Sequence, residues 1–174
     1  AGIGSKLLHD TLDYLAQESS ASKVLVESQL KAQPFYERAG FTQVSSKVLD
    51  HFGVLHHVLS LDLDTYRQPR NAVSIDDATV SIRPLEATDL RSLQKLSIET
   101  FVDTFIGSNT ADDLASCMDS LYNTEKLARE LAAKHSYFYF IEVEGQVAGY
   151  LKLNTRYEQT EGQRDDSLEI ERLY

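Results

Sequence analysis

The sequence predicts an α/β fold in which helices flank a mixed central sheet. Segments with the period of an α-helix alternate along the chain with short runs rich in β-branched and aromatic residues. One such run follows a helix and is apolar at neighbouring positions, as in a parallel strand covered on both faces. Two later runs are separated by a short glycine turn, as in an antiparallel hairpin. A sheet that contains both kinds of strand is mixed.

In residues 1–63 the apolar spacing and the turn residues predict five elements. Pro34 suits the first turn of a helix, and Gly40 can take the left-handed conformation that ends one. Two alternating runs are expected to pair around Phe52-Gly53. The expected elements are a helix at 4–17, a strand at 23–28, a helix at 29–39 and strands at 41–49 and 56–63.

Residues 64–79 have the composition of a linker, with Pro, Asn and several acids but no sustained period. Beyond it, Thr88 and Thr124 are expected to cap helices, and Thr110 with Asp113 resembles a capping box. Strands are expected at 80–85, at 137–143 and 146–154 around Glu144-Gly145, and at 168–173 after a polar loop.

The composition argues against several classes of function. A formal net charge of -10 disfavours a nucleic-acid or anionic-membrane surface and suits a cationic small molecule. Cys117 is the single cysteine, which rules out an internal disulfide and is read as a small buried hydrophobe. No apolar run approaches the length of a membrane span, so we expect a cytoplasmic protein.

A glycine pair opens the first helix in "AGIGSKLL". Glycines at a helix start let backbone N–H groups approach a phosphate, and the helix dipole favours negative charge there. A dinucleotide-binding Rossmann unit fits poorly, because no strand precedes the glycines and G-x-G-x-x-G is incomplete.

With "QLKAQPFYERAGF" further on, residues 2–63 resemble the C-terminal half of a GNAT superfamily acyl-CoA N-acyltransferase. "AGIGSKLL" is similar to the end of the family's pyrophosphate-binding motif, and Gln29 stands where the family usually has Asn. The resemblance implies that the coenzyme binds to Gly2, Ile3, Gly4, Ser5, Gln29 and Tyr36.

Residues 80–174 resemble the N-terminal half of another GNAT member, of the bacterial spermidine/spermine N-acetyltransferase type. In that group the strand matching "IERLY" leads into the pyrophosphate loop, which implies coenzyme contacts at Leu173 and Tyr174. The GNAT fold elements then stand in permuted order on the two sides of the linker at 64–79.

Two arrangements could explain this order. The chain could be a slice of a tandem acetyltransferase, or the halves could dock as one permuted domain. In the second case strand 168–173 lies beside strand 24–28, within one chain or across a homodimer or strand-swapped dimer. The two strands would splay apart where the acyl-CoA enters.

The resemblance implies acetyl transfer from acetyl-CoA to a primary amine, with a polyamine as a candidate acceptor. Tyr36 occupies the family's position for the acid that protonates the leaving sulfur, and its alternative role is a packed aromatic. Glu169 and Glu171 share one face of the last strand, as catalytic bases or as solvated carboxylates.

A non-catalytic CoA-binding or interaction module stays open, because neither half has an uninterrupted pyrophosphate loop. We therefore expect weak coenzyme binding and little turnover from this segment alone. Asp50, His51, His56 and His57 are residue types that bind metals and they cluster around a turn, but no further ligands complete the set and no metal is expected.

Overall fold

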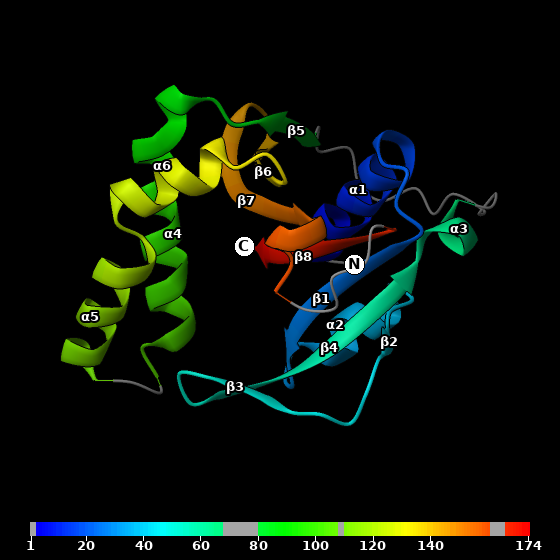
Figure 1. Ribbon diagram of the computed structural model, residues 1–174, viewed down its shortest axis with the longest axis horizontal. Helices are drawn as coiled ribbons and strands as arrows, with labels where there is room; N and C mark the ends of the chain where they lie inside the picture. Colours follow the sequence, from blue (N-terminus) through cyan, green and yellow to red (C-terminus); the bar gives the residue numbers. More distant parts are fainter. Residues whose placement is uncertain (1–2, 68–79, 108–109, 161–165) are drawn as a thin grey trace.

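The computed structural model describes residues 3–67, 80–107, 110–160 and 166–174, which build one mixed sheet (Figure 1). The strand order is β2-β4-β1-β8-β7-β6-β5, and β3 pairs with β4 outside this path. The β1–β8 pair is parallel and the other described pairs are antiparallel. The expected α/β fold with a mixed sheet and flanking helices is confirmed.

The first helix and strand follow the expected pattern. Helix α1 (Ile3–Glu18) buries Leu8, Leu12 and Leu15, which recur on one face because they are spaced by four and three residues. Strand β1 (Lys23–Gln29) alternates buried and half-buried positions. It lies between β4 and β8, so it is a central strand, as expected.

Helix α2 (Gln33–Arg38) begins four residues later than expected. Gln29 was assigned to this helix, but it stays in β1 because it pairs with His56 of β4. Pro34 stands in the first turn, and Gly40 follows the helix with φ 101°, which a glycine adopts without strain.

The chain then forms an antiparallel arm. Strands β2 (Thr42–Gln43), β3 (Leu49–His51) and β4 (Val54–Asp62) make up this arm. Phe52 and Gly53, with φ 55° and 78°, form the tight turn between β3 and β4, as expected.

Part of the expected linker is helical. Asp62 caps the short helix α3 (Leu63–Tyr66) by accepting a 2.7 Å hydrogen bond from the Thr65 N–H. The prediction of an irregular segment over 64–79 was therefore wrong at its start, and residues 68–79 lie outside the described residues.

Three helices follow, and two of their caps differ from the prediction. Strand β5 (Val80–Pro84) leads through the turn η1 (Ala87–Asp89) into α4 (Leu90–Phe105), and then come α5 (Ala111–Leu121) and α6 (Thr124–Ala132). Thr110 caps α5, as expected. The prediction that Thr88 caps a helix was wrong, because Glu86 and Asp89 form the capping box there. The prediction of a cap at Thr124 was also wrong, because the Asn123 side chain accepts a hydrogen bond from the Lys126 N–H at 2.8 Å.

The last three strands complete the sheet. They are β6 (Ser136–Val143), β7 (Gln146–Thr155) and, after the turn η2 (Arg156–Glu158), β8 (Ser167–Leu173). Glu144 and Gly145 form the β6–β7 turn with φ 52° and 77°. Gly149 of β7 allows a close backbone approach, since an added Cβ would lie 2.0 Å from the Tyr174 carbonyl oxygen.

The expected pairing between strands 168–173 and 24–28 is present within one chain. The parallel register runs from Lys23 opposite Ser167 to Val26 opposite Ile170 and stops there, although both strands continue. The two strands therefore separate toward their carboxyl ends, as the splay hypothesis required.

Two apolar clusters cover the two faces of the sheet. One combines α1 and α3 with strands β1, β4, β6, β7 and β8, and the other combines α4, α5 and α6 with β6 and β7. In Figure 1 the helices α4–α6 gather on one side, away from β2 and β4. Cys117 of α5 is half-buried rather than fully buried. None of the described helices has both the length and the apolar character needed to cross a bilayer.

Candidate functional site

A pocket of about 410 Å³ opens where β1 and β8 stop pairing. Its walls are residues 26–29 at the end of β1, residues 170–174 at the end of β8, and side chains from α2, β4 and α4. Ligands of open α/β sheets bind beyond the carboxyl ends of parallel strands, which is where this pocket lies. This position makes the pocket the candidate binding site of the fold.

Five residues expected in the site line this pocket together. They come from opposite ends of the sequence and are Gln29, Tyr36, Glu171, Leu173 and Tyr174. These five residues meet around the gap that opens where β1 and β8 separate.

The pocket reaches both faces of the sheet. Four consecutive residues of β1 line it, and neighbouring residues of a strand point to opposite faces. Glu27 and Gln29 share one face with His56, since Gln29 and His56 are partners in the β1–β4 register. Helix α2 covers the other face, where Gln33 bonds to His57 at 2.8 Å.

A β-bulge re-aims the end of β8 at the pocket. In the β7–β8 ladder Leu153 pairs with Ile170 and Lys152 pairs with Arg172, which leaves Glu171 as an extra residue. A bulge bends its strand and increases the local twist. Glu171 therefore lies where β8 turns away from β1.

Tyr36 reaches the pocket from α2 and is half-buried. Its ring makes edge contacts with Phe35 and Phe41, with centroids 5.1 Å and 5.6 Å apart. Burial, and secondarily the neighbouring Tyr174, raise the pKa of Tyr36 to about 12. The phenol is therefore protonated at neutral pH, the form that a proton donor needs.

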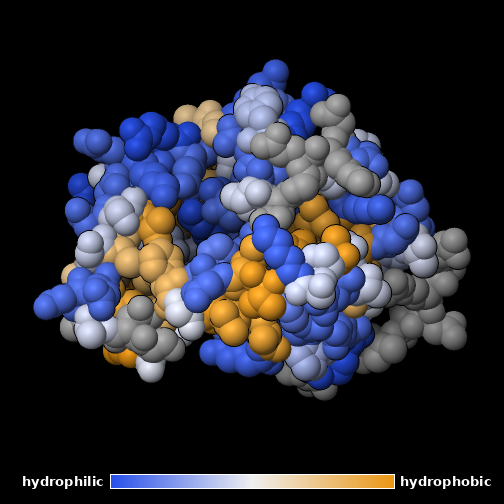
Figure 2. Space-filling model, turned by 60° about the horizontal axis from the view of Figure 1, so that its bottom comes forward, coloured by the Kyte–Doolittle hydropathy of each residue, from blue (hydrophilic) through white to orange (hydrophobic). Residues whose placement is uncertain are grey.

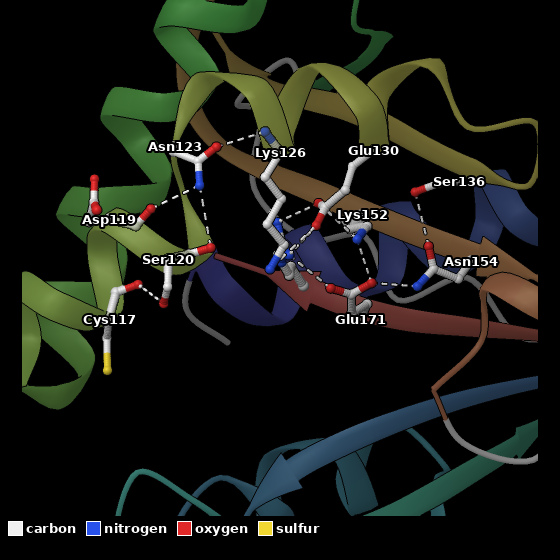
Figure 3. A network of polar contacts seen from close by, with 11 residues as sticks. Cys117, Asp119, Ser120, Asn123, Lys126, Glu130, Ser136, Lys152, Asn154 and Glu171 are labelled. Atoms are coloured by element: carbon white, nitrogen blue, oxygen red, sulfur yellow. Dashed lines mark hydrogen bonds and ion pairs between the residues drawn. The ribbon is translucent and has the colours of Figure 1, made fainter.

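Glu171 belongs to a network of buried ion pairs (Figure 3). Its carboxylate lies 2.6 Å from Lys152 Nζ and 3.0 Å from Arg172, and it accepts a hydrogen bond from Asn154. Glu130 of α6 pairs with both cations, at 3.0 Å and 3.2 Å. Burial would raise the pKa of Glu171, but Arg172 and then Lys152 outweigh it and lower that pKa.

Glu169 lies on the same face as Glu171 but outside the pocket lining. It is 1% exposed, and the Thr160 N–H and the Asn154 amide donate to its carboxylate at 3.0 Å and 3.3 Å. Burial raises the pKa of Glu169 despite these bonds. Neither carboxylate is a freely solvated strand residue.

The glycine turn is described only in part. Gly2 lies outside the described residues, and Ile3 and Gly4 open α1, whose first N–H groups have no partner within the helix. The nearest side-chain atom to a Cβ at Gly4 would be in the Phe35 ring, at 3.8 Å. The Ser5 carbonyl is 2.7 Å from His9 Nδ1.

His56 and Asp103 also line the pocket, although the sequence pattern indicated His56 only as a possible metal ligand and did not single out Asp103. His56 is 7% exposed, and its Nδ1 lies 2.9 Å from the Val54 carbonyl oxygen. His51 Nε2 lies 2.7 Å from Glu27. The histidines clustered in residues 51–57 were the signal for this site in the sequence, and their residue type suggested a metal site. No group of three ligands placed to hold a metal ion exists in the described part of the chain.

Comparisons with known proteins agree with the resemblance of the first half. Residues 1–63 match the family described as "Acetyltransferase (GNAT) domain". The "uncharacterized N-acetyltransferase in pepI 3'region" of Lactobacillus delbrueckii subsp. lactis is 42% identical over 95 residues, which cover 55% of this chain and 55% of that protein. The chain thus spans about half the length of this curated relative.

Among solved structures, one similar chain is the PaiA N-acetyltransferase from Thermoplasma acidophilum in complex with coenzyme A. Its TM-score is 0.45 at 22% identity, covering 55% of this chain and 58% of that chain. The sequence comparisons thus show a match of residues 1–63 to a GNAT acetyltransferase domain and similarity of part of the chain to an N-acetyltransferase.

Proposed function

We propose that this chain, whose residues 1–63 match a GNAT acetyltransferase domain, transfers an acetyl group from acetyl-CoA to a primary amine. The observation that carries the proposal is the pocket between the separated ends of β1 and β8. It gathers a half-buried tyrosine, a carboxylate and the ends of two central strands in one volume.

The strand separation suits an extended coenzyme arm. Beyond Val26 and Ile170 the facing edges of β1 and β8 no longer pair with each other. Their backbone N–H and C=O groups can therefore bond to the amides of a pantetheine chain, as a strand edge bonds to an added strand.

The docked halves make up the site together. We infer that residues 3–63 and 80–174 form one GNAT-type fold with its elements in permuted order. The parallel register between Val24 and Leu168 supports this arrangement, because it joins the halves through central strands.

The chemistry is a direct transfer. The amine nitrogen attacks the thioester carbonyl carbon, the C–S bond breaks, and the sulfur leaves with the bonding electron pair. Tyr36 donates its proton to that sulfur from the α2 side of the sheet.

The acceptor is a cationic amine, with polyamines as the class that fits best. Glu27, Asp103 and Glu171 line the pocket with two cations, Lys31 and Arg172. Arg172 and Glu171 are already paired with each other, which leaves Glu27 and Asp103 against Lys31. This excess of negative charge, in a chain of net charge -10, attracts an ammonium group.

Calorimetry with acetyl-CoA tests the site, and thiol release with spermidine tests the reaction. Ala32→Trp places a large side chain on the pocket wall and is expected to weaken coenzyme binding at least tenfold. Ala132→Trp, on the exposed surface of α6, is the matched control and keeps wild-type binding. Binding without acetyl transfer would favour a CoA-binding module, and absence of binding would refute the proposal.

A further inference from the structure

His56 presents an unprotonated ring nitrogen. Its Nδ1 lies 2.9 Å from the Val54 carbonyl oxygen, and a carbonyl oxygen only accepts hydrogen bonds. Nδ1 must therefore carry the proton. In the neutral ring, Nε2 then holds a lone pair that can accept a proton.

His56 lies on the opposite side of the sheet from the proposed acid. It lines the pocket, and its register partner Gln29 places it on the face of Glu27. Tyr36 comes from α2, which covers the other face. A thioester held in the gap between the strands would thus have a donor on one side and an acceptor on the other.

The carboxylates of this region are weaker candidates for removing a proton. Glu171 is held by two cations and an amide, and these contacts stabilise its ionised form. Glu169 does not line the pocket. A base is most efficient when its pKa is near the working pH, which favours an imidazole over a stabilised carboxylate.

Burial keeps His56 neutral at pH 7. It lowers the pKa of the imidazole, as His51 also does, and the Val54 bond and Asp50 oppose this. The other charged groups that share the pocket are Glu27, Lys31, Asp103, Glu171 and Arg172.

We propose that His56 is the general base of the acetyl transfer inferred above, on which this assignment rests. Nε2 takes one proton from the bound ammonium group, which gives an imidazolium and a neutral amine whose lone pair attacks the thioester carbonyl carbon. The C–S electron pair goes to sulfur, which receives the Tyr36 proton. The Tyr36 phenolate then takes the second N–H proton, so that the neutral amide forms, and His56 releases its proton to solvent.

His56→Asn tests the assignment, because asparagine can keep a donor near the Nδ1 position but has no Nε2. With acetyl-CoA and spermidine at pH 7, kcat/KM is expected to fall at least about a hundredfold while CoA binding stays unchanged. The residual rate should rise with pH, since an amine already deprotonated in solution needs no base. The matched control is His135→Asn, whose ring contacts Tyr157 and does not line the pocket, and which should keep the wild-type rate and pH profile.

Nitrogen NMR of the wild-type chain gives a readout that does not depend on activity. It should show His56 protonated at Nδ1 and unprotonated at Nε2 at pH 7, and the reverse tautomer would overturn the assignment. Wild-type transfer that survives in His56→Asn would overturn the base alone. A wild type that binds acetyl-CoA but transfers to no amine would overturn the proposed reaction and, with it, this assignment.

Discussion

Replacing Lys152 by methionine tests the buried ion network most directly. Lys152 has a side chain 6% exposed, lies over the Phe138 ring, and pairs with Glu130 at 3.0 Å and Glu171 at 2.6 Å. Methionine keeps an unbranched stem in this space but removes the charge. Two carboxylates, 18% and 20% exposed, then lose a cation.

The loss of stability in Lys152→Met depends on the cation that remains beside the two carboxylates. Removing one partner of a buried ion pair costs about 3–5 kcal/mol. Here Arg172 stays 3.2 Å from Glu130 and 3.0 Å from Glu171, so part of the charge is still compensated. We expect Lys152→Met to lower the free energy of unfolding by about 2–3 kcal/mol. For a chain of this length the Tm would fall by about 5–10 °C.

The pH dependence has a definite sign. The pKa of Glu171 is lowered in the folded state, so its pairing stabilises the protein above the ordinary value of 4.5 and is lost as the pH falls through the folded-state value. Lys152→Met removes part of that stabilisation. The difference in stability between wild type and variant should therefore shrink below pH 4.5.

Urea unfolding at pH 7 and pH 4 measures both effects. Lys95→Met is the matched control, because Lys95 is 78% exposed and pairs at 3.8 Å with an exposed Glu99, so its loss should leave the unfolding midpoint unchanged. A Lys152→Met midpoint equal to wild type at pH 7 would refute the view that this network stabilises the fold.

Three further predictions concern the proposed acid Tyr36, the close backbone contact at Gly149 and the helix cap at Asn123. Tyr36→Phe should lower turnover about a hundredfold while calorimetry shows unchanged CoA affinity, because only the donated proton is lost. Gly149→Ala should cost about 1–3 kcal/mol in thermal unfolding, since its Cβ would collide with the Tyr174 carbonyl and the strands must move apart. Asn123→Ala should cost about 1 kcal/mol in the same assay, whereas Thr124→Ala should cost clearly less, because Asn123 provides the cap. Equal effects at those two positions would contradict the cap assignment.

Sequence patterns predicted correctly those elements whose conformation depends on residues close together in the chain. The leucine spacing of α1 and the turn at Phe52-Gly53 follow from helix periodicity and from the tolerance of glycine for positive φ. The caps at Thr88 and Thr124 failed because a competing neighbour with a better acceptor was one or two residues away. Gln29 was placed in a helix because its strand pairing with His56 is not visible in the local sequence.

The sequence predicted part of the site from two signals. The resemblance singled out Gln29 and Tyr36, strand alternation singled out Glu171, and the structure brings all three to one pocket. Neither signal could show that Glu171 is neutralised by Lys152, because this pairing depends on three-dimensional contacts between strands. His56 was not predicted as a pocket residue for the same reason, since its burial and its bond to the Val54 carbonyl come from the fold.

The sequence also did not predict the exposed apolar side chains on the antiparallel arm of β2, β3 and β4. Val44, Val48, Phe52 and Leu55 are exposed, and Figure 2 shows apolar patches among hydrophilic side chains on the face that turns forward from the lower side of Figure 1. Phe52 makes edge contacts with Phe101 and Phe105 of α4, at 5.8 Å and 6.1 Å between centroids. The arm therefore links the two halves at a second place, away from the parallel strands.

The parallel β1–β8 pair also affects when the sheet can be completed during synthesis of the chain. Lys23 and Ser167 are partners although 144 residues separate them along the chain. At about 5–20 residues per second, a ribosome needs roughly 7–29 seconds to make that stretch, during which one edge of β1 waits for its neighbour. A newly made chain is thus most exposed to aggregation just before β8 emerges, and this protein should depend more on chaperones than one whose sheet is built from adjacent hairpins.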